Sequence, residues 1–180
     1  MLDKKRIKEA ESNARQYLEE GLLKKRKNET AKLMYLENSD LSLETAEKLL
    51  GLENENYKPY LWIIVTSYYA MYYISNAVLL EFGYKVGDKI SHKVTADSLI
   101  VFVRNKLKKE LIEDYKEVKE DAQDLIASKV DTLIESFDFE LGKRSRFQYR
   151  MEEEVKKGKA MTSLERAKKF VFEMKKLIHQ

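Results

Sequence analysis

YLWIIVTSYYAMYYISNAVLL, residues 60–80, is a run of 21 residues without a charged side chain, and it decides the fold prediction. Pro59 precedes it, and proline is well tolerated in the first turn of a helix. By length alone such a helix could span a bilayer. Nine of its residues are polar or tyrosine, however, and tyrosines in a spanning helix concentrate at its ends rather than its middle. We therefore predict the buried central helix of a bundle, whose hydroxyl groups need partners inside the fold or across a subunit contact.

The composition predicts one folded helical domain. The chain has 180 residues, of which 36% are charged and 43% hydrophobic, and its mean hydropathy is -0.56. One proline and six glycines provide few turns for a many-stranded sandwich or barrel. The absence of cysteine excludes disulfides, thiolate nucleophiles and iron–sulfur clusters. Because the sequence beginning at Met1 also lacks the apolar stretch of a secretory signal, we expect a cytoplasmic protein.

Apolar residues recur at three- and four-residue steps along most of the chain, as in amphipathic helices. Besides residues 60–80, this spacing predicts helices over 3–26, 29–51, 91–108 and 109–136. A last helix is predicted to begin at Thr162, which has capping-box spacing to Glu165, and residues 137–161 are the least regular part. The prediction is an all-α, up-and-down bundle of about five to six helices. It forms a single domain, 1–180, with a basic amphipathic helix in 1–27 and the core bundle in 29–180.

Charge is distributed unevenly, although the net charge is only +3. Residues 1–27 carry 9 basic and 5 acidic side chains, residues 143–180 carry 12 and 5, and residues 28–142 carry 13 and 21. If the two basic ends meet in the fold, they make a surface that attracts phosphate. The alternative is an ordinary solvated helix surface.

KRSRFQYR, residues 143–150, interleaves basic and aromatic residues. Guanidinium groups bind phosphate oxygens, and flat rings stack on unpaired bases. Arg144, Arg146, Tyr149 and Arg150 are therefore candidate residues for binding RNA or a nucleotide. The alternative is that these arginines form ion pairs with the acidic residues 152–154.

Other constellations give weaker signals for chemistry. The two histidines, His92 and His179, are too few for most metal or triad chemistry. His92 begins a predicted helix beside Lys93, where the helix dipole and the cation both lower its pKa, so we expect a structural or hydrogen-bonding residue. The tyrosines of residues 68–73 are spaced as in core or interface packing. We expect no metal site and no cofactor.

Residues 57–102 resemble the HEPN superfamily of small prokaryotic helical proteins. The resemblance rests on Ser67-Tyr68-Tyr69-Ala70 in the central helix and on Ser91-His92-Lys93 after it. Residues 31–50 and 162–178 look like that family's second and last helices, so the resemblance covers roughly 29–180.

The resemblance implies a homodimeric bundle of about five helices with an RNA-facing cleft at the dimer contact, and it adds Ser67 and Tyr68 to the candidate binding residues. In the family's ribonucleases an Arg, followed four to six residues later by a His, lies in that cleft. Arg144 matches the Arg, but Tyr149 stands five residues on, and tyrosine, with a pKa near 10, is a poor base at neutral pH. In the toxin branch a tyrosine two residues past the His is adenylylated, and Met151 occupies that place here.

Three hypotheses follow. The first is a dimeric protein that binds RNA or a nucleotide through Arg144, Arg146 and Tyr149, with nuclease activity absent or vestigial. The second is a protein-interaction module that partners a nucleotidyltransferase, as in toxin–antitoxin pairs. The third is an active, metal-independent ribonuclease, with Arg144 and either Tyr149 or His92 as catalytic residues.

Overall fold

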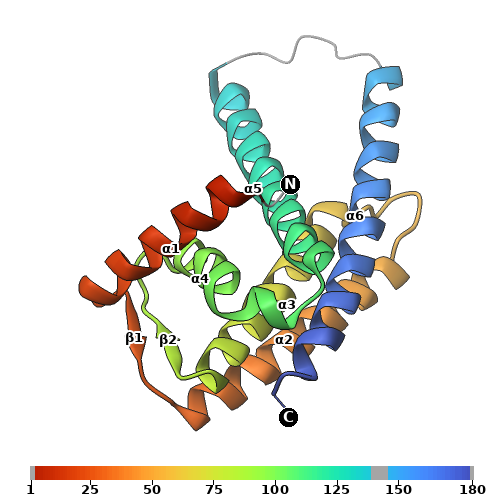
Figure 1. Ribbon diagram of the computed structural model, residues 1–180. Coiled ribbons are helices and arrows are strands. Elements are labelled where there is room, and N and C mark those ends of the chain that lie inside the picture. The colour runs from red at the N-terminus through yellow and green to blue at the C-terminus, as the bar shows by residue number, and fades with distance from the viewer. Residues whose placement is uncertain (1–2, 139–145, 179–180) are drawn as a thin grey trace.

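The computed structural model describes residues 3–138 and 146–178, which form a helical bundle with a small sheet at one edge (Figure 1). This confirms the predicted all-α helical bundle. The α-helices are α1 (Lys4–Glu19), α2 (Glu29–Gly51), α3 (Tyr60–Glu81), α4 (Ser91–Ser98), α5 (Lys109–Asp138) and α6 (Arg146–Lys175). A π-helical segment, Leu99–Val103, and a 3₁₀ turn, Arg104–Lys106, follow α4. The strands are β1 (Leu23–Lys25) and β2 (Tyr84–Val86).

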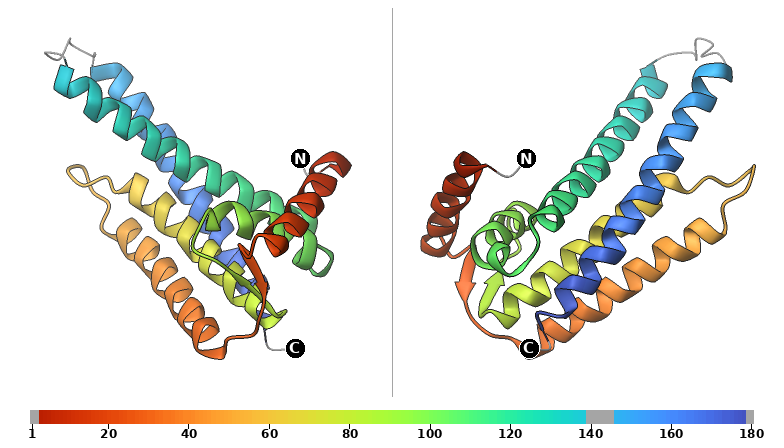
Figure 2. Two further views of the ribbon diagram at one scale, coloured as in Figure 1. Left: turned by 90° about the vertical axis from the view of Figure 1, so that its left-hand side faces the viewer. Right: turned by 45° about the vertical axis from the view of Figure 1, so that its right-hand side comes forward.

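α3 is the central helix, as its uncharged sequence predicts. Sixteen of its 22 residues are buried, because α2, α5 and α6 all pack against it (Figure 2). α3 is long and apolar enough to cross a membrane, but 83% of its most apolar window is buried against the rest of the bundle. This burial favours the core-helix interpretation over a spanning segment.

Several polar side chains on α3 find partners within the bundle. The hydroxyl of Ser75 donates to the carbonyl oxygen of Met71 at 2.6 Å. The side-chain amide of Asn76 donates to the backbone carbonyl oxygen of Tyr72 at 2.9 Å. From α2, the Ser39 hydroxyl donates to the carbonyl oxygen of Ala70 at 2.8 Å. These bonds offset the cost of burying polar groups in an otherwise apolar core.

The first predicted helix, 3–26, is too long. α1 ends at Glu19, because Gly21 adopts a left-handed conformation with φ of 71°, and the chain then enters β1. Strand β1 pairs antiparallel with β2, which opposes Lys24 to Lys85. Residues 84–86 are thus a strand whose partner lies about 60 residues earlier, and local periodicity cannot reveal such a pairing.

Two further boundaries differ from the prediction. The helix predicted over 91–108 is divided into α4, the π-helical segment and the 3₁₀ turn. The last helix begins at Arg146 rather than Thr162, so Thr162 and Glu165 lie inside α6 and do not cap it. A capping-box spacing also arises by chance within a continuous helix, and residues 146–161 contain no proline to interrupt one.

α5 and α6 pack against each other near the core, and both extend beyond the other helices, where Figure 1 shows them diverging (see also Figure 2). Their extended ends are joined through residues 139–145. α6 therefore begins away from the core and enters it along its length, where Ala160, Leu164 and Phe170 are buried against α3 and its neighbours.

Replacing one buried side chain of α3 tests its central role. Ile74→Ala leaves a cavity where the side chain is fully buried, and we expect it to lower the free energy of unfolding by about 2–5 kcal/mol. Trp62→Ala, on the same helix, removes a larger side chain that is 56% exposed and should cost less than about 1 kcal/mol. Urea denaturation measures the free energy of unfolding of both variants. Equal losses for the two variants would contradict the assignment of α3 as the core.

Candidate functional site

The segment predicted to bind RNA lies at the start of α6. Arg144 lies outside the described residues. Arg146, Tyr149 and Arg150 lie in the first two turns of α6, where the structure describes the backbone. Their spacing of three and four residues gives them neighbouring positions on the helix.

Ser67 and Tyr68, the other candidate binding residues, lie in the core. Ser67 is fully buried, and its hydroxyl has no hydrogen-bond partner within the described part of the chain. Tyr68 is 5% exposed. The fold therefore does not present these two side chains to a ligand on the surface of the bundle.

The two basic ends of the chain lie on different sides of the bundle. α1 packs against α4 and the π-helical segment, whereas α6 packs against α2, α3 and α5 (Figure 2). α1 and α6 therefore do not bring the two basic ends together into one basic surface.

Most cations of α6 whose side chains the structure describes form ion pairs within the bundle. Basic side chains along the helix reach acidic groups of the middle region at 4.0 Å or less: Lys157 pairs with Glu53, Lys159 with Asp121, Arg166 with Asp114 and Glu117, Lys168 with Glu47, Lys169 with Glu110 and Lys175 with Asp40. Each exposed pair contributes at most about 1 kcal/mol, but together they neutralise this part of the helix. Ion pairs with acidic groups of the middle region thus neutralise much of the positive charge of α6.

The N-terminal cations behave differently. Lys24, Lys25, Arg26 and Lys27, in and after β1, are exposed and make no ion pair with any residue that the structure describes. Lys85 faces Lys24 across the ribbon, where like charges repel. This edge of the molecule therefore keeps an unneutralised positive field.

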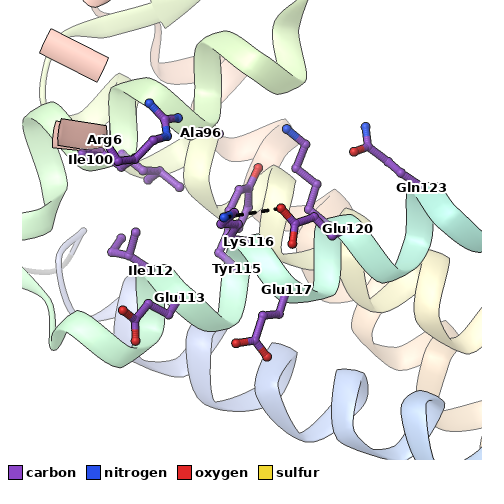
Figure 3. A pocket seen from close by; sticks show the side chains of 12 residues that line it. Arg6, Ala96, Ile100, Ile112, Glu113, Tyr115, Lys116, Glu117, Glu120 and Gln123 are labelled. Atoms are coloured by element: carbon purple, nitrogen blue, oxygen red, sulfur yellow. Dashed lines mark ion pairs between the residues drawn. The ribbon is translucent and has the colours of Figure 1, made fainter. Parts of the chain in front are cut away.

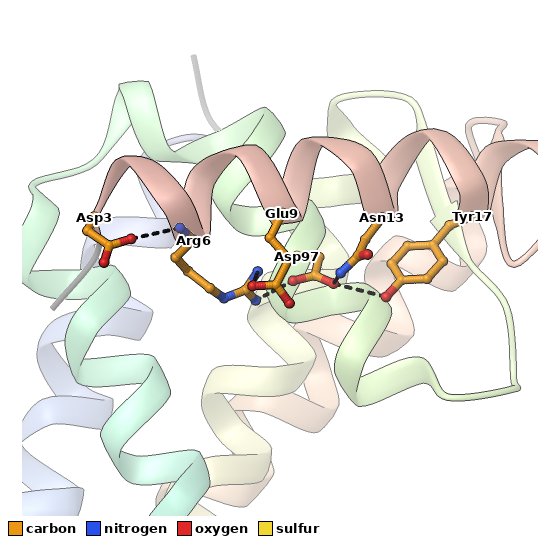
Figure 4. Close-up of polar contacts among 6 residues, drawn as sticks. All are labelled: Asp3, Arg6, Glu9, Asn13, Tyr17 and Asp97. Atoms are coloured by element: carbon orange, nitrogen blue, oxygen red, sulfur yellow. Dashed lines mark hydrogen bonds and ion pairs between the residues drawn. The ribbon is translucent and has the colours of Figure 1, made fainter.

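A buried carboxylate, Asp97, joins α4 to α1 (Figure 4). Arg6 forms an ion pair with its Oδ1, and Oδ2 accepts hydrogen bonds from the Asn13 side-chain amide and the Tyr17 hydroxyl, both at 2.9 Å. Residues 6, 13 and 17 are spaced by seven and four, which puts them on one face of α1. Burial, followed by the bond to Asp97, raises the pKa of Tyr17 far above its usual range, so its hydroxyl stays a donor.

The sequence contains one signal for this network that the periodicity of apolar residues does not reveal. Asp97 is the only charged residue in 94–103, a stretch that is otherwise apolar or small. A carboxylate in such a stretch is buried when its helix is, and a buried charge needs donors from a neighbouring element. The position of that element could not be predicted, because its donors lie 80 to 91 residues earlier in the chain.

His92 is packed among tyrosines at the start of α4. Its Nδ1 lies 2.7 Å from the hydroxyl of Tyr68, and its ring centroid lies 4.3 Å from that of Tyr72. Burial lowers the pKa of His92, and the charge of Lys119 lowers it further. The hydrogen bond to Tyr68 agrees with the expected hydrogen-bonding role. The pKa is lowered as expected, but by burial and Lys119, whereas the prediction relied on the helix dipole and Lys93.

The described side chains favour structural roles over catalysis. Nδ1 of His92 is engaged in a hydrogen bond with the hydroxyl of Tyr68, whose pKa is raised chiefly by burial, so neither group is a ready base or nucleophile. Among residues 3–138 and 146–178, no group of three His, Cys, Asp or Glu side chains is arranged to hold a metal ion.

Removing the Asp97 charge should loosen α1. In Asp97→Asn the donors of Arg6, Asn13 and Tyr17 lose a fully buried carboxylate acceptor, and we expect a loss of about 3 kcal/mol in unfolding free energy. Glu9→Gln is the control, because the Glu9 carboxylate is exposed and its 4.0 Å distance from Arg6 is too long for a strong interaction. It should change stability by less than about 0.5 kcal/mol in the same urea titration. A result in which the two variants are equally stable would contradict the network's role.

His92 should make stability depend on pH. Its folded pKa is depressed below 6.5, so the unfolded chain takes up the proton first as pH falls. Stability from neutral His92 is therefore present above about pH 6.5 and is lost below it. NMR titration of the imidazole measures the pKa directly, and Lys119→Met should raise it while Lys116→Met should not. A pKa above 6.5 in the unmodified chain would contradict this account.

Comparisons with known proteins supply no relative for this arrangement. No protein-family model, curated protein or solved structure matches the chain. The function proposed below therefore rests on the residues of this chain and their geometry.

Proposed function

We propose that the protein binds single-stranded RNA through residues 143–150, with nuclease activity absent. The observation that carries the proposal is the alternation of Arg144, Arg146 and Arg150 with Phe147 and Tyr149. Arginines neutralise phosphates, while aromatic rings stack on unpaired bases without requiring a particular sequence.

The position of this segment supports the proposal. α6 begins at Arg146, at the extended end of the α5–α6 pair and away from the packed core (Figure 1). The N-terminal end of a helix carries a partial positive charge and free backbone N–H groups, which favour phosphate. A flexible strand of RNA can reach such an end without displacing other helices.

The charge distribution within the bundle also supports it. Downstream cations of α6 are paired with acidic groups of α2 and α5, so they offer little to a polyanion. The exposed cations after α1 have no such partners and add a long-range attraction that speeds association.

The arrangement supports binding rather than cleavage. By the HEPN resemblance, Tyr149 stands where the family's ribonucleases carry a His, and an ordinary tyrosine is protonated at neutral pH. The only described histidine, His92, lies on α4, away from the start of α6, and its Nδ1 is already bonded to Tyr68 (Figure 1). The homodimer and the nucleotidyltransferase partner, which the HEPN resemblance implies, stay predictions.

A pair of matched variants tests the binding surface. Arg144→Ala with Arg146→Ala should weaken binding of a 12-nucleotide oligouridylate by about tenfold or more and reduce the slope of log affinity against log salt by about 1.4. Lys168→Ala with Lys169→Ala removes the same charge from α6 at paired positions and should change affinity less than about threefold. Fluorescence anisotropy at two or more salt concentrations measures both.

The same titrations, repeated with a mononucleotide and followed by gel analysis of the RNA, separate the alternatives. Equal weakening in both double variants would show general charge attraction and contradict a site at 143–150. RNA cleavage that is lost in Arg144→Ala would favour the ribonuclease hypothesis. Absence of RNA and nucleotide binding would favour the protein-interaction module.

A further inference from the structure

An uncharged face remains exposed where α2 and α3 lie side by side (Figure 2). Four of its large side chains are in contact with solvent: Met34 is 58% exposed, Leu41 52%, Trp62 56% and Tyr69 36%. Since 36% of the residues in this chain are charged, a face of this kind does not follow from a shortage of charged residues. Apolar residues that gather on one face mark an interaction surface, whereas single scattered ones do not.

Spacing and contacts place these side chains on the same flank of the helix pair. Residues 34, 38, 41 and 45 form one stripe of α2, and residues 62, 66, 69 and 73 form one stripe of α3. The rings of Tyr35 and Tyr73 stack between the stripes, with their centroids 6.1 Å apart. α6 lies on the other flank of α2, where two of its lysines reach acidic residues. Neither stripe contains a charged residue, and together they are called the α2–α3 face.

Burying the α2–α3 face costs little in lost hydrogen bonds. The hydroxyls of Thr45 and Thr66 donate to carbonyl oxygens of their own helices at 2.7 Å, so they keep their partners when water is removed. At the rim, Glu44 pairs with Lys48 at 2.6 Å. An aromatic and apolar centre with a polar rim is typical of a protein–protein interface.

The cavity of about 610 Å³ between α1, α4 with its π-helical segment, and α5 differs in this respect (Figure 3). Three basic and three acidic side chains line it. Two of the acidic ones already have partners, because Glu120 lies 3.6 Å from Lys116 and Glu117 lies 2.7 Å from Arg166. The balanced lining selects neither an anion nor a cation, whereas the α2–α3 face has a consistent character.

From these observations we propose that the α2–α3 face binds the same face of a second copy of the chain. Two antiparallel helix pairs then form a four-helix contact around a two-fold axis. Side chains near such an axis meet their own copies, and like charges there would repel. A face without charge avoids this repulsion. A lipid surface is a poorer partner, because helices that lie on membranes carry lysine or arginine beside their apolar residues.

The size of the face is sufficient for a weak, specific dimer. The stripe from Met34 to Thr45 continues to Leu52, which is 61% exposed, so the face is about 27 Å long at 1.5 Å per residue. Two helices side by side are about 20 Å wide, which gives about 540 Å² per copy and about 1,100 Å² in total. This area lies just above the roughly 1,000 Å² that a specific contact needs, so we expect a dissociation constant on the order of 10 µM. Each copy folds around its own core, and at protein concentrations below this constant the contact adds little to stability.

The proposal is independent of RNA binding, because the α2–α3 face shares no residue with 143–150. It also differs from the arrangement that the HEPN resemblance implies, in which RNA lies at the dimer contact. Here the contact is made by α2 and α3, and α6 is not part of the face.

Sedimentation velocity of the full chain between 1 and 200 µM tests the proposal. The mass should rise with concentration from 21.3 kDa towards twice that value. Leu41→Lys with Trp62→Lys puts two cations on the face and should raise the dissociation constant by about thirtyfold or more, since like charges then meet. Leu41→Glu with Trp62→Glu should do the same. An equimolar mixture of the two double variants should associate again, because opposite charges now face each other.

Met161→Lys with Phe172→Lys is the matched control. Both residues are exposed and apolar but lie on α6, so the same added charge should change the dissociation constant less than threefold. Circular dichroism of each variant confirms that it is folded.

Three results would overturn the proposal. The first is an unmodified chain that stays monomeric at 200 µM. The second is a dimer that the lysine and glutamate variants form as readily as the unmodified chain, which would mean a contact through another face. The third is a mixture of the two charged variants that stays monomeric, which would mean that the face does not meet its own copy.

Discussion

Burial of the uncharged helix α3 is the constraint on which the other helices depend. A helix that is apolar on nearly every side has to be covered on every side, and α2, α5 and α6 supply most of that cover. α4 closes a further side, where its Thr95 hydroxyl reaches Asn76 at the centre of the core. Most polar side chains that α3 encloses have partners, and Asp97 and His92 are the main examples, whereas the buried hydroxyl of Ser67 has none among the described residues.

The charged residues follow from the same packing. Helices that cover α3 have polar outer faces, and the basic face of α6 lies beside acidic groups on α2 and α5. The exposed cations in and after β1 form no such pairs among the described residues, and they attract polyanions from solution.

Helix 60–80 and the helical bundle could be predicted from the sequence because an uncharged run of 21 residues has few stable environments. The β1–β2 pairing and the early start of α6 could not be predicted, since they depend on contacts between distant segments or on a helix without a clear apolar stripe. For the site, residues 143–150 come from local composition and remain a prediction, as does the HEPN resemblance. The Asp97 network and the cavity required the fold, because their residues come from α1, α4 and α5.

Native-state hydrogen exchange, followed residue by residue in increasing urea, tests most directly whether enclosure of α3 organises the molecule. The account predicts that the buried amides between Ile63 and Leu80 exchange most slowly and only through global unfolding. Amides of α1, which is held to α4 by Asp97 and a few small side chains, should exchange through a smaller opening. Amides of α3 that exchange as fast as those of α1, or that are protected only in detergent, would contradict the account.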